Sequence, residues 1–147
     1  MNMLEVPLVR LDVDLPIPRQ ARVGDGGVDL YARLEVLLAP AGGRAAVPTG
    51  IAVAIPAGYA GFIQPRSGLA LHHGVTCLNS PGLIDSGYRD EIVVVLVNTD
   101  PREAYEVRRG DRIAQLVIQR VESPVFRTVP ALPASERGDG GFGHTGR

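Results

Sequence analysis

Short apolar runs broken by glycine and proline make up most of the chain, which contains 18 Gly and 12 Pro. Val28 and Leu30 lie on one face of a short alternating run, and Asp29 and Tyr31 lie on the other, as expected of a strand. Residues 92–97 are apolar on both faces, which indicates burial on both sides, with another subunit as one candidate cover. Strands are expected at residues 6–13, 28–32, 34–38, 44–47, 50–55, 61–64, 75–78, 92–98, 104–107 and 112–121, and one short helix at 67–73. Many brief strands separated by regular turns predict an all-β sandwich or barrel.

The chain has 147 residues, the usual size of one domain, and a formal net charge of -1. That charge argues against a non-specific binder of nucleic acid or membrane surfaces, so neither partner is expected. The first residues lack the pattern of a secretory signal, and no run approaches the roughly 18 apolar residues that span a bilayer. We therefore expect a cytoplasmic protein. Cys77 is the one cysteine, which excludes an internal disulfide, and a small buried hydrophobe is favoured over a nucleophile.

The character of the chain changes after residue 121. Residues 1–121 carry the strand pattern of a core, and residues 122–147 form a proline-stiffened arm that ends in a glycine-rich segment. The arm is expected to belong to the same domain. Its end is either a frayed terminus or a lid, because one Arg and one aromatic set among bare backbone N–H groups can close over an anion.

Residues 80–91 read S-P-G-L-I-D-S-G-Y-R-D-E and run directly into a β-rich stretch. The pattern predicts a hairpin whose tip carries the carboxylate of Asp85, the ring of Tyr88 and the guanidinium of Arg89. Asp before Ser-Gly is also common as a plain Asx-turn former, so these residues alone leave both interpretations open.

Residues 65–70, P-R-S-G-L-A, join a strand end to the expected helix. Unpaired N–H groups at a helix start favour phosphate oxygens, and Arg66, Ser67 and Gly68 would add charge, a hydroxyl and close backbone approach. The alternative is that Ser67 serves only as an N-cap.

Other polar positions are less specific. Gln115 alternates with apolar neighbours, so its amide faces either a pocket or solvent. Asp29 places a second carboxylate at a strand start. His72 and His73 are adjacent and lack the spacing of a metal pair, so we expect surface or helix-end residues.

Five segments, in this order, resemble the five motifs of the trimeric dUTP pyrophosphatases (dUTPases). They are D-G-G-V-D-L-Y-A at 25–32, P-R-S-G-L-A at 65–70, N-S-P-G-L-I-D-S-G-Y-R at 79–89, R-G-D-R-I-A-Q at 109–115 and R-G-D-G-G-F-G-H-T-G at 137–146. Each segment alone is weak, but five collinear matches over nearly the whole chain are specific. Two positions depart from the family pattern: Asp90 stands where the family usually has Gly, and His144 where it has Ser.

The resemblance implies a β-jelly roll (the β-clip, dUTPase-like fold) with one short helix. It also implies a homotrimer with three shared active sites, in which each C-terminal arm crosses to a neighbour. The implied reaction is dUTP plus water giving dUMP and pyrophosphate, with Mg²⁺ on the triphosphate. Such a reaction limits uracil incorporation into DNA and supplies dUMP for dTMP synthesis.

The resemblance also assigns roles to residues. Asp85 would be the general base for the water that attacks the α-phosphorus, and Asp29 would orient water bound to the metal. Tyr88 would pack on the deoxyribose and exclude a 2′-hydroxyl, while Arg137 would bind the γ-phosphate. Substrate contacts are implied for Arg66, Ser67, Gly68, Asn79, Gly82, Leu83, Ile84, Tyr88, Gln115, Arg137, Phe142, His144, Thr145 and Gly146. Among these, the 79–84 backbone would pair with uracil, Phe142 would stack on it, and His144 would replace the family serine as a donor.

Two other functions remain to be weighed. A dCTP deaminase shares this fold and trimer, but it uses a glutamate, and here Asp85 is followed by the Tyr-Arg pair. A jelly-roll module that binds without turnover is the second alternative. The presence of the full set of implied site residues argues against that loss.

Overall fold

The computed structural model describes residues 3–138 and 140–141. It contains eleven strands and one helix in the described residues. In chain order these are β1 (Leu8–Arg10), β2 (Val28–Tyr31), β3 (Val36–Leu38), β4 (Arg44–Pro48), β5 (Ile51–Val53), β6 (Tyr59–Gln64), α1 (Ser67–His73), β7 (Val75–Cys77), β8 (Gly82–Ile84), β9 (Val93–Asn98), β10 (Tyr105–Val107) and β11 (Arg112–Arg120). The all-β class with one short helix is therefore confirmed.

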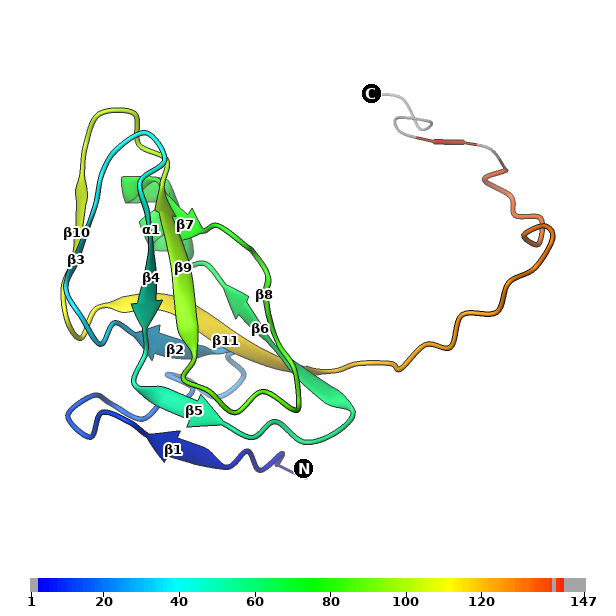
Figure 1. Ribbon diagram of the computed structural model, residues 1–147, viewed down its shortest axis with the longest axis horizontal. Coiled ribbons are helices and arrows are strands. Elements are labelled where there is room, and N and C mark those ends of the chain that lie inside the picture. The colour runs from blue at the N-terminus through cyan, green and yellow to red at the C-terminus, as the bar shows by residue number, and fades with distance from the viewer. Residues whose placement is uncertain (1–2, 139, 142–147) are drawn as a thin grey trace.

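The strands form two main antiparallel sheets and two smaller ribbons (Figure 1). One sheet has the order β2-β11-β6-β8, and the other has the order β4-β9-β7. The ribbon β1-β5 lies at one end of the molecule, and the ribbon β10-β3 runs along one side (Figure 1). β11 is the longest strand and pairs with β2 on one edge and β6 on the other, so it joins residues far apart in the sequence.

A single apolar core lies between the two main sheets, because its buried cluster draws on strands of both. Leu30 of β2 and Ile113 of β11 contribute from one sheet, and Leu96 of β9 from the other. Burial of β9 is less even than its sequence predicts. Val94 is fully buried, but Val93 at the start of the strand is 37% exposed in the single chain.

The predicted hairpin over residues 80–91 is wrong. β8 pairs with β6, whereas β9 pairs with β4 and β7, so the two sides of this segment belong to different sheets. The physical reason lies at the end of the segment. The Ile92 carbonyl oxygen accepts hydrogen bonds from the amide and hydroxyl of Thr49, which directly follows β4, so the chain is held beside the second sheet. The segment is therefore a corner between the sheets, and Asp85 and Tyr88 lie in that corner.

The helix α1 begins without a side-chain cap. Arg66 occupies the N-cap position, so Ser67 is the first helical residue and its interpretation as an N-cap is wrong. Gly74 ends the helix with φ of 65°, and its amide donates to the Ala70 carbonyl, a common glycine C-cap. His72 and His73 lie in the last turn and are exposed, as expected.

After β11 the chain leaves the sheets and extends away from them (Figure 1). Residues 121–138 contain no helix or strand and are almost entirely exposed. Within the described part of the chain, no helix combines the length and the apolar character needed to cross a membrane.

Candidate active site

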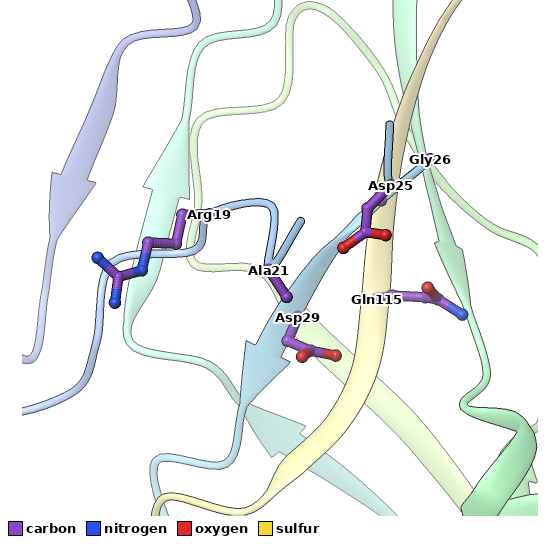
Figure 2. A pocket seen from close by; sticks show the side chains of 7 residues that line it. Arg19, Ala21, Asp25, Gly26, Asp29 and Gln115 are labelled. Atoms are coloured by element: carbon purple, nitrogen blue, oxygen red, sulfur yellow. The ribbon is translucent and has the colours of Figure 1, made fainter. Parts of the chain in front are cut away.

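Strand pairing places the first and fourth sequence motifs side by side. Asp29 of β2 stands directly opposite Gln115 of β11. Together with Arg19, Asp25 and the glycines before β2, these residues line an open pocket of about 270 Å³ (Figure 2). Gln115 therefore faces a pocket and not only solvent.

The second motif joins the same cluster at the end of β6. The Gln115 Nε2 donates to the Pro65 carbonyl oxygen at 3.1 Å, and the Arg66 Nε lies 3.2 Å from Asp29 Oδ1. Arg66 also donates to the Arg112 carbonyl oxygen at 3.1 Å. Three segments far apart in the sequence thus converge around the Asp29 carboxylate.

Arg112 is a member of this cluster that the sequence analysis missed. Its guanidinium lies 3.5 Å from Asp29 Oδ2, so arginines face both oxygens of that carboxylate. In a regular strand, residues three apart point to opposite faces, so Arg112 and Gln115 would not be expected to share one. The register shift between Arg112 and Ala114 breaks this alternation. With two arginines around one carboxylate, the cluster carries a net positive charge beside the pocket.

Ser67 and Gly68 are exposed next to this cluster. No atom lies within 4 Å of the position that a Cβ on Gly68 would take, so the backbone there is open to a ligand. Arg66 itself is only half-buried, which leaves its guanidinium accessible.

The oxygen ligands beside the pocket suit a hard cation, but few are available. In the part of the chain that the structure describes, no three His, Cys, Asp or Glu side chains are grouped so that they could hold a metal. Asp25 and Asp29 both line the pocket, and Asp25 already accepts a hydrogen bond from the Arg22 amide. A Mg²⁺ ion fits only if phosphate oxygens and waters complete most of its octahedron.

The third motif lies at a different place. The side chain of Asp85 is exposed, and its carbonyl oxygen accepts a hydrogen bond from the Tyr88 amide at 3.1 Å, which closes a turn. The Tyr88 ring packs partly against the core, and its hydroxyl donates to the Glu91 carbonyl oxygen at 2.8 Å. Asp90 has no positive φ, so a side chain in place of the family glycine fits this backbone without strain.

Residues 79–84 run along β6 toward this turn. Gly82 is buried, and a Cβ there would lie 3.2 Å from the Ile63 Cβ, so a larger residue would require Ile63 to shift. The Ile84 side chain is also buried, whereas Leu83 and Asn79 are exposed. Ile84 can therefore meet a ligand only through its backbone.

The pairing of β6 with β8 separates Asp85 from Arg66 within one chain. Gly61 pairs with Ile84 and Ile63 with Gly82, so Asp85 lies beside the beginning of β6 while Arg66 follows its end. At about 3.3 Å per residue, the two lie roughly 15–20 Å apart along the strand. The structure of one chain thus brings motifs one, two and four together and leaves the third apart.

Arg137 is exposed in the arm, where its guanidinium donates to the carbonyl oxygens of Gly140 and Gly141. Phe142, His144, Thr145 and Gly146 lie outside the described residues. Cys77 is buried, and desolvation raises the pKa of its thiol to about 11, which agrees with a hydrophobic role.

The antiparallel sheets define an all-β protein, and the two arginines that face Asp29 beside the open pocket provide a site suited to an anionic ligand. The family model of dUTPase matches residues 14–146, and the chain belongs to the dUTPase family. The deoxyuridine 5′-triphosphate nucleotidohydrolase of Thermobifida fusca is 59% identical over 143 residues, covering 97% of this chain and 79% of that protein. The enzyme of that name from Corynebacterium glutamicum is 49% identical over 146 residues, covering 99% and 97%.

Solved structures show the same fold. The dUTPase of Staphylococcus bacteriophage 80alpha with dUPNHPP has a TM-score of 0.90 at 27% identity, covering 99% of this chain and all of that one. A mutant dUTPase from phage phi11 of S. aureus, described with a structural Mg(II) ion, has a TM-score of 0.81 at 23% identity, covering 89% of this chain and all of that one.

Proposed function

We propose that this protein hydrolyses dUTP to dUMP and pyrophosphate. The convergence of three sequence motifs on the cluster of Arg66, Asp29 and Gln115 beside an open pocket carries the proposal. The net positive charge of this cluster suits a triphosphate, and the family and its named relatives specify the nucleotide.

Phosphate binding falls to the residues at the end of β6 and in β11. Arg66 supplies a guanidinium, Ser67 and Gly68 supply exposed polar groups, and Gln115 supplies an amide. Bound Mg²⁺ would neutralise charge on the triphosphate oxygens, with Asp29 and Asp25 as its nearest carboxylates. The arginines that already face Asp29 restrict its carboxylate to one orientation, which suits the alignment of a water molecule.

The chemical step places a water molecule between Asp85 and the α-phosphorus. Its oxygen forms the new bond to phosphorus, the bond from phosphorus to the bridging oxygen breaks, and pyrophosphate leaves. Asp85 accepts the water proton, a contribution of about 10²–10⁴-fold in rate. The remaining acceleration comes from alignment and from neutralisation of the developing negative charge.

Selection of deoxyuridine belongs to the corner that contains Asp85. The ring of Tyr88 would pack on the deoxyribose and leave no space for a 2′-hydroxyl. The backbone of Asn79, Gly82, Leu83 and Ile84 would pair with the uracil edge. In the arm, Arg137 would bind the γ-phosphate, Phe142 would stack on uracil, and His144, Thr145 and Gly146 would add phosphate contacts.

A complete site then requires more than one chain. Since one chain keeps Asp85 and Arg66 at opposite ends of β6, a nucleotide that contacts both must lie between two copies. A homotrimer with three shared sites and crossing arms meets this requirement.

Substitution of Asp85 by Asn tests the reaction. We expect turnover of dUTP to fall by at least about 10²-fold, because the base is lost, while affinity for a non-hydrolysable dUTP analogue stays within a few-fold. Pyrophosphate release measures the first quantity and isothermal titration calorimetry the second.

Asp90→Asn is the matched control, since it removes a neighbouring exposed carboxylate and is expected to retain the rate. A near-normal rate for Asp85→Asn would exclude Asp85 as the base. The native chain is also assayed with dTTP, dCTP and UTP in place of dUTP. Release of ammonia from dCTP would indicate a deaminase and not a dUTP hydrolase.

A further inference from the structure

The corner between the two sheets is held by a residue outside the implied site, Glu91. Both oxygens of its carboxylate accept hydrogen bonds from Arg33 NH1, at 3.1 and 3.2 Å. One of these oxygens also accepts the Gly50 amide at 2.8 Å. The carboxylate is half-buried, with 22% of the side chain exposed. Its hydrogen bonds to Arg33 and Gly50 join the corner to two distant loops.

The same residue also holds Tyr88. Its carbonyl oxygen accepts the Tyr88 hydroxyl at 2.8 Å, while the Tyr88 amide donates to the Asp85 carbonyl. With the backbone held at Asp85 and the hydroxyl held at Glu91, the phenol cannot swing away from this place without breaking one of these bonds. The position of the ring is thus set by the position of Glu91.

The anchor itself is well supported. Gly50 has φ of 75°, and a Cβ there would lie 2.9 Å from the Asp12 Cβ, so only glycine places this amide against Glu91. The Arg33 guanidinium also donates to the Leu11 carbonyl oxygen at 3.2 Å and lies 3.6 Å from Asp12. These contacts hold the Arg33 guanidinium in place independently of its ion pair with Glu91.

We propose that Glu91 is a positioning residue for sugar selection: the Arg33 and Gly50 contacts to its carboxylate fix the carbonyl that holds the Tyr88 hydroxyl. The inference rests on the proposed function, because Tyr88 matters for selection only if it faces the deoxyribose. It goes beyond that function by assigning part of the discrimination between dUTP and UTP to groups that touch neither nucleotide.

Glu91→Gln tests this assignment. Glutamine keeps the shape and an oxygen for the Gly50 amide but removes the ion pair with Arg33. We expect the ratio of kcat/KM for dUTP to that for UTP to fall by about three- to tenfold, the effect of one displaced hydrogen bond. Glu106→Gln is the matched control, since it removes a more exposed ion pair of similar length, with Arg108, and is expected to leave the ratio unchanged.

Tyr88→Phe provides a second test that keeps the ring and removes only the bond to Glu91. It should lower the same ratio. Adding Glu91→Gln to it should lower the ratio little further, because both changes break the same set of contacts, which connects the Glu91 carboxylate to the Tyr88 ring. A purely structural Glu91 would lower the melting temperature without changing the ratio, and an unchanged ratio in folded Glu91→Gln or in Tyr88→Phe overturns the proposal. Failure of the native chain to hydrolyse dUTP would overturn the proposed function instead.

Discussion

Asp12 shows how much of the structure depends on single polar residues that the sequence does not single out. Its carboxylate accepts hydrogen bonds from Arg109, 97 residues away, and lies close to Arg33. Only 13% of the side chain is exposed. Neither Asp12 nor Arg33 lies in a recognisable motif, and nothing in the local pattern predicts a contact over that separation. Arg109 does lie in a motif, but its partner could not be inferred from it.

Hydrogen bonding from Arg109 lowers the pKa of Asp12 from 3.8 to about 2, and the nearby arginine charges add to this effect. The unfolded chain therefore binds this proton first as the pH falls, so the folded state loses stability between about pH 4 and pH 2. We expect Asp12→Asn to lower the melting temperature at neutral pH and to flatten its decline over that acidic range.

Thermal unfolding followed by circular dichroism from pH 2 to 7 measures both effects. Asp14→Asn is the control, since Asp14 is exposed and its carboxylate is not in the Arg109 pair. Parallel pH curves for native and Asp12→Asn chains would show that the pair contributes nothing to acid stability.

At the scale of strands and helices, the sequence predicts where elements lie but not how they pair. The expected helix at 67–73 and the strands β6, β9, β10 and β11 begin or end within two residues of the predictions. Alternation and turn residues are local signals, so they locate such elements well. The strand β8 was missed because its three residues begin with the glycine of a Pro-Gly pair and are too few to show alternation. Its pairing with β6 depends on long-range packing.

Gly61 is closely packed at the centre of three core side chains. A Cβ at this position would lie 2.9 Å from the Ile55 Cδ1, 3.0 Å from the Leu116 Cδ1 and 3.2 Å from the Ile84 Cβ. We expect Gly61→Ala to lower the free energy of unfolding by about 1–3 kcal/mol, because the core must shift to admit a methyl group. The shift would also displace β8, which leads to Asp85, so kcat for dUTP should fall as well.

Urea unfolding and pyrophosphate release measure the two effects. Gly26→Ala is the control for stability, since no atom lies within 4 Å of its added Cβ and its φ is ordinary. Native stability in Gly61→Ala would mean that the sheets adjust freely at this position, contrary to the close contacts.

At the scale of the whole molecule, one chain holds the first, second and fourth motifs together and keeps Asp85 of the third motif apart from them. Large apolar side chains remain exposed in the arm, including Val125, Phe126 and Leu132, and Val93 of β9 is only partly covered. Such surfaces are usual where chains associate. For the proposed shared site, the sequence motifs identify the groups but not the chain that would supply each one, because motif order carries no information about pairing register. The register of β6 with β8 supplies that distinction, since it keeps Asp85 away from Arg66.

Mixed oligomers can test whether the site is shared. Asp85→Asn and Arg66→Gln chains are each expected to be almost inactive as homo-oligomers. If one chain supplies the base and another the arginine, random mixing in equal amounts restores about a quarter of the native activity, because a quarter of sites receive both intact groups. If one chain supplied both, mixing would restore nothing.

In the reciprocal mixture of native chains with chains carrying both substitutions, a shared site again retains about a quarter of the activity, whereas a site within one chain retains about half. Refolding the mixtures from denaturant, with mass determined by sedimentation against the 15.6 kDa of one chain, separates true complementation from failed assembly.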